Sequence, residues 1–193
     1  MQGPIRAMRL FIAFELTNEI RSAVADLLGE LRKPDPQAKW VRAENLHVTL
    51  KFLGRTEPDK LVAIQNALGS LRSPEPTTLD FQGLGFFPSE KRARVFWMGM
   101  KASSNLPPLA EAIDHAMHKL GFPLETRPFA PHLTLARFEP PGLPAKLGPA
   151  VKQNSAGNFG SLTTREFHLI ESKLKPTGAE YTTLQSFPFV AGT

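Results

Sequence analysis

The sequence contains no cysteine, and this absence excludes three kinds of chemistry. Without thiols the chain forms no disulfide, no thiolate zinc site and no cysteine nucleophile. Long hydrophobic runs are missing as well: no stretch of about 18 uncharged apolar residues occurs, so we expect no membrane-spanning helix. The N-terminal region leads into the short apolar run Leu10–Phe14, which lacks the apolar length and cleavage site of a signal peptide. These absences predict a cytoplasmic protein.

Several motifs for nucleotide and acyl chemistry are also absent. Neither G-x-G-x-x-G nor G-x-x-x-x-G-K-[ST] occurs, so the use of ATP is not indicated. No G-x-S-x-G motif is present, which disfavours a serine nucleophile. We therefore expect no cofactor.

The 193 residues suffice for one large domain or two small lobes with a substantial core. With 41% hydrophobic and 21% charged residues, the composition is that of an ordinary soluble globular protein. The net charge of +5 favours a polyanionic partner such as a nucleic acid or nucleotide, although an excess of this size also occurs on ordinary soluble surfaces. We expect a single two-lobed domain over residues 1–193, acting as a monomer.

One four-residue pattern, His-x-Thr-Leu, occurs twice, as His47–Leu50 and as His132–Leu135. The chain has only five histidines, so two full copies are not expected by chance. Both copies lie in apolar runs with alternating character, around residues 46–53 and 131–138, which predicts two β-strands. Residues i and i+2 of a strand project from the same face, so each histidine should share a face with its threonine.

Two imidazoles and two hydroxyls that face one cavity suit a phosphodiester substrate. A neutral histidine can take a proton from water while a protonated one gives a proton to the departing oxygen, and threonine hydroxyls can bind phosphate oxygens. A histidine pKa of about 6.5 allows both protonation states near neutrality. A lone histidine on a strand is more often structural than functional, but the duplication reverses that expectation.

The remaining pattern predicts alternating strands and helices without a long linker. We expect strands over residues 9–15, 40–41, 46–53, 79–87, 94–100, 131–138, 166–174 and 181–190. We expect helices from Thr17 to beyond Leu31, from Thr56 through Leu68, over 106–120, and over 143–153. The run 88–92 should form the basic tip of a hairpin.

An internal repeat organises these elements. His132 follows His47 by 85 residues, and the same offset lays residues 94–96 on residues 9–11. The chain thus resembles two copies of strand, helix, His-strand and helix. If the copies fold symmetrically, the two His-strands should lie across a shared cleft.

Cationic and aromatic residues surround the motifs. Arg127, in a stiff proline-rich loop before His132, is the best candidate for holding a phosphate. For Lys51 and Arg137, surface charge and substrate contact are equal alternatives, because simple alternation points Arg137 away from the His132 face unless a bulge turns it. Three phenylalanines are expected mainly in the core, with stacking on a base as the alternative: Phe52, Phe129 and Phe138.

A metal site is the main rival for the histidines. His115 and His118 are spaced i, i+3 on a predicted helix and could add ligands, but no acidic residue joins them in a recognisable pattern. A solvated helix face is the simpler interpretation of this pair. His168 belongs to a predicted strand and carries no motif. No metal is expected.

The flanking residues resemble the RNA 2′,3′-cyclic phosphodiesterases, also called 2′-5′ RNA ligases, of the two-histidine phosphoesterase superfamily. The segments that carry this resemblance are 44–54, 127–137, 86–88, 94–97 and 171–174, with Gly178 and Tyr181. The resemblance implies an α+β fold with bilobal pseudo-twofold symmetry, in which two antiparallel sheets line a central cleft and helices lie outside. It covers nearly the whole chain.

The resemblance also implies a reaction and residue roles. A 2′,3′-cyclic phosphate at an RNA 3′ end would be opened to a 2′-phosphate and a 3′-hydroxyl. His47 would be the general acid, His132 the general base, and Thr49 and Thr134 would hold the phosphate. The reverse reaction would join a cyclic phosphate to a 5′-hydroxyl without ATP. The motifs alone do not say which histidine is which.

Two other functions stay open at this point. The His-Thr pairs could grip terminal phosphates without turnover, which would make the protein an RNA-end-binding module. Alternatively, the same chemistry could act on a small cyclic nucleotide rather than on RNA.

Overall fold

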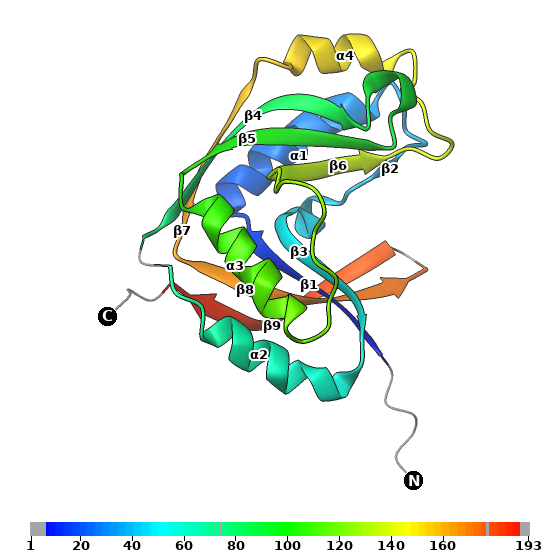
Figure 1. The fold of residues 1–193 in the computed structure, drawn as a ribbon. Coiled ribbons are helices and arrows are strands. Elements are labelled where there is room, and N and C mark those ends of the chain that lie inside the picture. The colour runs from blue at the N-terminus through cyan, green and yellow to red at the C-terminus, as the bar shows by residue number, and fades with distance from the viewer. Residues whose placement is uncertain (1–6, 74, 177, 190–193) are drawn as a thin grey trace.

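The computed structural model describes residues 7–73, 75–176 and 178–189 (Figure 1). Its strands are β1 (Met8–Glu15), β2 (Lys39–Trp40), β3 (His47–Thr56), β4 (Thr77–Phe87), β5 (Val95–Ala102), β6 (His132–Arg137), β7 (Asn158–Thr164), β8 (Glu166–Lys175) and β9 (Gly178–Pro188). Its helices are α1 (Asn18–Arg32), α2 (Leu61–Gly69), α3 (Leu106–His118) and α4 (Leu147–Asn154). Every predicted element is present. Strand β7 was not predicted, because its sequence is polar and rich in glycine and lacks clear alternation.

Helix α1 shows how local sequence produces an element. The Thr17 hydroxyl accepts a hydrogen bond from the Ile20 amide at 3.5 Å, which caps the helix. The apolar stripe is buried on one face: Ile20, Val24, Leu27, Leu28 and Leu31. Each such side chain contributes about 1.5–3 kcal/mol when fully buried, so this face docks the helix on the sheet.

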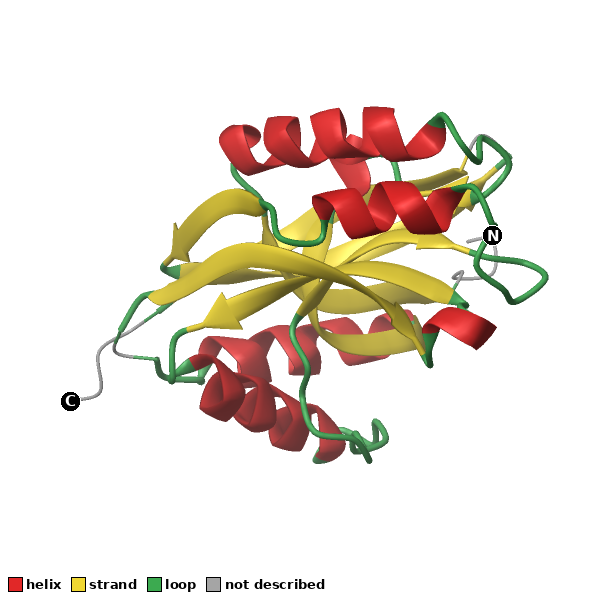
Figure 2. Cartoon of the chain, turned by 90° about the horizontal axis from the view of Figure 1, so that it is seen from above, coloured by secondary structure: helices red, strands yellow, loops and turns green. Residues whose placement is uncertain are grey.

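The strands form one curled, antiparallel sheet in the order β7-β4-β5-β6-β3-β1-β8-β9, with β2 paired to β6. Its two halves meet at β3 and β6, which are joined by the single pair Val48 and Leu133. Helices lie on both sides of the sheet (Figure 2). Helices α1 and α4 pack near β7 and β4, whereas α2 and α3 pack near β9 and β3. The predicted bilobal α+β fold is therefore confirmed.

The two halves repeat the same arrangement around β3 and β6. The order β3-β1-β8-β9 on one side corresponds to β6-β5-β4-β7 on the other. In β1 and β3, Glu15 lies opposite His47; in β5 and β6, Gly99 lies opposite His132. The repeat is thus 85 residues between the His-strands but 84 between their partners. The single offset predicted for residues 9–11 is wrong by one, and Phe11 corresponds to Val95.

A β-bulge occurs at the same place in both His-strands. In β3 the extra residue is Leu50, and in β6 it is Leu135. A bulge reverses the alternation of the residues that follow it. Lys51 and Ala136 are therefore buried, whereas Phe52 and Arg137 emerge on the face of the histidines.

The hydrophobic core is continuous through both halves of the sheet. A small separate cluster lies on the concave face, where Phe11, Ala13 and Ile170 pack with Tyr181. No helix in the described ranges is both long and apolar enough to cross a membrane.

Candidate active site in the cleft

The two His-Thr pairs lie next to each other where the half-sheets meet. Because β3 and β6 are antiparallel and Val48 faces Leu133, His47 lies beside Thr134 and Thr49 beside His132. Directly opposite residues are about 5 Å apart and diagonal ones about 7–8 Å. The diagonal histidines are thus spaced to hold a phosphate between them. The structure brings together all four predicted motif residues.

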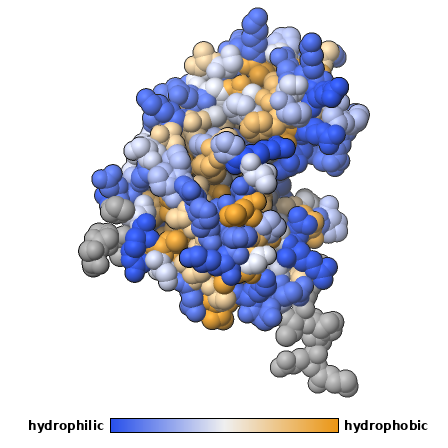
Figure 3. All heavy atoms as spheres, in the orientation of Figure 1, coloured by the Kyte–Doolittle hydropathy of each residue, from blue (hydrophilic) through white to orange (hydrophobic). Residues whose placement is uncertain are grey.

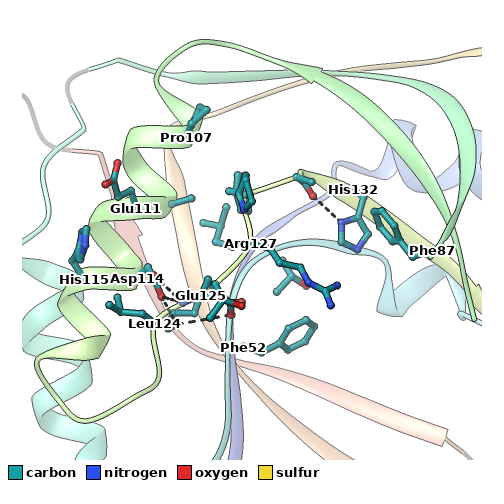
Figure 4. A pocket seen from close by; sticks show the side chains of 18 of the residues that line it. Phe52, Phe87, Pro107, Glu111, Asp114, His115, Leu124, Glu125, Arg127 and His132 are labelled. Carbon is teal, nitrogen blue, oxygen red and sulfur yellow. Dashed lines mark hydrogen bonds and ion pairs between the residues drawn. The ribbon is translucent and has the colours of Figure 1, made fainter. Parts of the chain in front are cut away.

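Each histidine ring is oriented by the backbone in the same way. The Nδ1 atom of His47 lies 2.8 Å from the Asn45 carbonyl oxygen, and that of His132 lies 2.9 Å from the Ala130 carbonyl oxygen (Figure 4). A carbonyl can only accept, so Nδ1 carries the hydrogen in both rings. Nε2 is then the atom free for proton transfer. Asn45 is itself anchored, because its side chain donates to the Ala179 carbonyl at 2.7 Å.

His47 lies in an aromatic environment. The centroid of its ring is 4.6 Å from that of Phe11 and 5.2 Å from that of Tyr181. Burial lowers the pKa of His47, and the positive charges of Arg21, His132 and Arg137 lower it further, against the opposing hydrogen bond to Asn45. The free protein therefore favours the neutral form of His47.

His132 lies at the edge of a cavity and has a different aromatic neighbour. The Phe87 ring meets His132 edge-on at 5.2 Å and packs on Trp97 at 5.1 Å. Trp97 lies over Gly85, where a Cβ would be 2.3 Å from the indole ring. Glycine at this position lets the Trp97 ring support Phe87 from below.

The cavity beside His132 has a volume of about 950 Å³ and lies between α3, β3 and the loop of residues 122–131. On the face seen in Figure 3, a notch separates the two lobes, and hydrophilic side chains line its rims. Figure 4 shows Arg127 reaching from the loop into the space between His132 and Phe52. The predicted phosphate ligand Arg127 therefore lies in the same cleft as the motifs.

Phe52 is not in the core, where it was mainly expected. Its side chain is 60% exposed, because the bulge at Leu50 turns it toward the cleft. Phe138 is buried in the core, and Phe129 is half-buried in the cavity wall. The core prediction thus holds for Phe138 and is wrong for Phe52.

Lys51 lies in the cavity wall with its ammonium group occupied. The group forms an ion pair with Asp114 and donates to the Pro123 carbonyl at 2.9 Å, and only 2% of the Lys51 side chain is exposed. The Asp114 carboxylate also accepts from the Glu125 amide at 3.1 Å. Burial alone would raise the pKa of Asp114, but the hydrogen bonds from Lys51 and Glu125 hold it below its usual value. Lys51 therefore ties the loop that carries Arg127 to β3.

Arg137 lies on the histidine face at the end of β6, opposite Val95. Its side chain is exposed, and its charge acts on both His47 and Tyr181. The bulge at Leu135 places it there, which answers the alternation problem in the sequence.

The other histidines lie outside this arrangement. His115 lies at the cavity rim, and the Nδ1 atom of His118 is 3.1 Å from the Phe122 carbonyl oxygen. His168 is buried in β8, with Nδ1 2.9 Å from the Ser186 hydroxyl. In the part of the chain that the structure describes, no group of three His, Asp or Glu side chains could hold a metal ion.

Four aromatic neighbours of the histidines could not be identified from their own sequence positions: Phe11, Phe87, Trp97 and Tyr181. Strand periodicity marks Phe11 and Trp97 only as strand residues. Tyr181 is the one tyrosine of the chain and is more than 130 residues from His47 in the sequence. Only the order of strands in the sheet brings these rings to the cleft.

Comparison with known proteins identifies the family. A family model described as LigT-like phosphoesterase matches residues 14–97 and 100–181, and each segment contains one His-x-Thr motif. The chain belongs to the LigT-like phosphoesterase family. This membership confirms the resemblance that the paired motifs predicted.

Similar proteins cover this LigT-like phosphoesterase almost completely. A Methanothermobacter thermautotrophicus protein named RNA 2′,3′-cyclic phosphodiesterase is 34% identical over 93% of this chain and 98% of its own. A crystal structure of a Thermus thermophilus protein matches with a TM-score of 0.77 at 31% identity, over 94% of this chain and 98% of that one. The crystal structure of E. coli LigT with 3′-AMP matches with a TM-score of 0.76 at 29% identity, over 95% and 98%.

Proposed function

We propose that this protein is an RNA 2′,3′-cyclic phosphodiesterase that opens the cyclic phosphate to a 2′-phosphate and a 3′-hydroxyl without a metal ion. The observation that carries the proposal is the pair of histidines, each with Nδ1 bound to a backbone carbonyl and Nε2 free, flanked by threonines on one concave face. The names of its relatives support the substrate class.

The two histidines account for both proton transfers. Neutral His132 takes a proton from water through Nε2 while the water oxygen attacks phosphorus. The bond from phosphorus to O3′ breaks, and protonated His47 gives its Nε2 proton to O3′. One turnover leaves His132 protonated and His47 neutral, and exchange with solvent restores the starting states. The proton balance closes without a metal-bound water.

The remaining contacts bind the substrate. Thr49 and Thr134 donate to the non-bridging phosphate oxygens, and Arg127 adds a charged, two-pronged donor. Phe52 offers an exposed ring on which a base can stack. Arg137 adds positive charge near His47.

The lowered pKa of His47 is compatible with the role of general acid. The free protein has no anion at this site, whereas the bound cyclic phosphate carries a negative charge that favours the protonated imidazole. Substrate binding therefore raises the pKa of His47 when the proton is needed. The reverse reaction uses a 5′-hydroxyl in place of water, and the cyclic phosphate itself supplies the reactive bond, so ligation requires no ATP.

The experiment is hydrolysis of a short RNA that ends in a 2′,3′-cyclic phosphate, in chelator, with the position of the product phosphate determined by NMR. We expect multiple turnovers, a 2′-phosphate, and loss of activity in both His47→Ala and His132→Ala. Tight binding with no turnover would indicate the RNA-end-binding module instead. Turnover of cyclic mononucleotides but not of RNA would indicate a small-nucleotide enzyme.

A further inference from the structure

The concave face continues beyond the histidines along β1 and β3. Phe11 and Phe52 are cross-strand partners, and so are Arg9 and Arg55 at the next position on this face. Partners in an antiparallel sheet point to the same side, and Phe11 packs on His47. Arg9 and Arg55, both exposed, therefore project from the side of the sheet that carries the active site.

Two arginines directly opposite each other are unfavourable in a sheet, because like charges repel at this separation. Glu57 offsets Arg55 in part, at 3.7 Å. Within residues 7–73, 75–176 and 178–189, no carboxylate lies within 4.0 Å of the Arg9 guanidinium. A bound anion would relieve the repulsion between these two side chains.

Tyr181 connects this arginine pair to the catalytic pair. Its ring lies 5.0 Å from Phe11 and 5.2 Å from His47. Burial raises the pKa of Tyr181, and the charges of Arg137 and Arg9 act against that rise, so both cations lie near the phenol. Arg9 comes from one half-sheet and Arg137 from the other, and they converge from the two walls of the cleft.

The opposite side of the histidine pair has the reverse charge. The cavity beside His132 is lined by three carboxylates, Glu111, Asp114 and Glu125, and by apolar rings. Of these, Asp114 is neutralised by Lys51. The cleft thus has an acidic and apolar side that suits uncharged groups and a cationic side that suits a phosphate.

We propose that Arg9, Arg55 and Arg137, with the Tyr181 hydroxyl, form a subsite for the internucleotide phosphate that precedes the terminal nucleotide of the RNA. The proposal rests on the proposed function and adds to it a preference for RNA ends over cyclic mononucleotides. Arg9 is two residues from Phe11, about 6.8 Å along the strand, so its long side chain reaches a phosphate next to the one held at His47.

The experiment compares two substrates in wild type, Arg9→Gln and Arg55→Gln. One substrate is 2′,3′-cyclic AMP, and the other is a diadenosine dinucleotide that ends in a 2′,3′-cyclic phosphate. We expect the ratio of dinucleotide to mononucleotide kcat/KM to fall about tenfold in Arg9→Gln, and the salt slope for the dinucleotide to become shallower by about 0.7. Arg165→Gln, which removes the same charge from an exposed loop position, should leave the ratio unchanged.

The outcomes separate this proposal from the proposed function. An unchanged ratio in both variants, with normal hydrolysis, overturns the subsite and leaves the phosphodiesterase intact. If wild type hydrolyses neither substrate, the proposed function fails. The subsite is then decided by fluorescence anisotropy with labelled RNA that ends in a 2′-phosphate: weaker binding by Arg9→Gln supports it, and equal binding overturns it.

Discussion

The strands β3 and β6 carry the same motif in two different environments. Both histidines bond through Nδ1 to the carbonyl two residues earlier, and both strands bulge at the leucine after the threonine. The neighbours differ: His47 packs between Phe11 and Tyr181, whereas His132 meets one edge of Phe87 beside an open cavity. The backbone repeat thus makes the two imidazoles geometrically alike, and their surroundings make them chemically different.

The positions after the bulge diverge further. Lys51 in β3 corresponds to Ala136 in β6, and Phe52 corresponds to Arg137. One half therefore carries a buried cation that ties down a loop and an exposed aromatic ring. The other half carries a small core residue and an exposed cation. The repeat supplies two equivalent frames, and substitution at matching positions assigns separate tasks to them.

The largest expected effect distinguishes the two histidines by the leaving group. Replacing either by alanine should slow hydrolysis of the natural cyclic phosphate about 10²–10⁴-fold, because one proton transfer is lost in each case. A substrate with sulfur in place of O3′ releases a thiolate, which needs no proton. We expect this substrate to restore much of the rate in His47→Ala but not in His132→Ala, measured by single-turnover kinetics.

The control for this comparison is His118→Ala on α3, which should leave both rates unchanged. If sulfur instead rescues His132→Ala and not His47→Ala, the assignment of acid and base is reversed while the chemistry stands.

The next effect tests the difference between Lys51 and Ala136. Lys51→Met leaves the Asp114 carboxylate without its buried partner, which should destabilise the protein by about 3–5 kcal/mol in urea unfolding. Loosening of the loop should also raise KM for RNA, because Arg127 lies on it. Lys33→Met removes an exposed pair with Glu30, in which both side chains are more than two-thirds exposed, and should cost less than about 1 kcal/mol.

The double variant Lys51→Met with Asp114→Leu sharpens the test. It should recover part of the stability lost in the single variant, because no uncompensated charge remains. A double variant that is less stable than the sum of the two single changes would contradict the assignment of this pair as a tie.

The smallest effect is a shift in the pH profile. A general acid must be protonated, and the pKa of His47 in the free protein lies below its ordinary value, so kcat/KM should already fall as pH rises through that lowered pKa. The anionic substrate raises this pKa in the complex, so the alkaline limb of kcat should lie at higher pH than that of kcat/KM. Measurement of both profiles at constant ionic strength checks the difference. Coincident limbs would mean that the substrate's charge does not act on His47.

Much of the fold could be predicted because apolar periodicity and proline positions act locally. The stripe of α1 and the alternation around both motifs indicate their elements directly. Strand β7 escaped because an edge strand with few apolar residues depends on its neighbour β4 for its hydrogen bonds. The one-residue difference in the repeat escaped because strand register is a property of the pairing and leaves no mark on either strand alone.

The site was predictable to the same extent. The motif residues and Arg127 could be named, because the chemistry of their side chains is visible in the sequence. The directions of Lys51, Phe52 and Arg137 could not, since a single bulge reverses every side chain after it. Neither could the partner of Lys51, because Asp114 is 63 residues away and reaches it only through the packing of α3 on β3.

The sequence by itself determined the two His-x-Thr strands, the succession of elements, the absence of thiol chemistry and the set of residues able to move protons. These are local properties of side-chain type and spacing. Only the tertiary structure decided which rings surround each histidine, which cations face the cleft and which is buried. Those depend on strand order, bulges and desolvation, which arise when distant segments pack together.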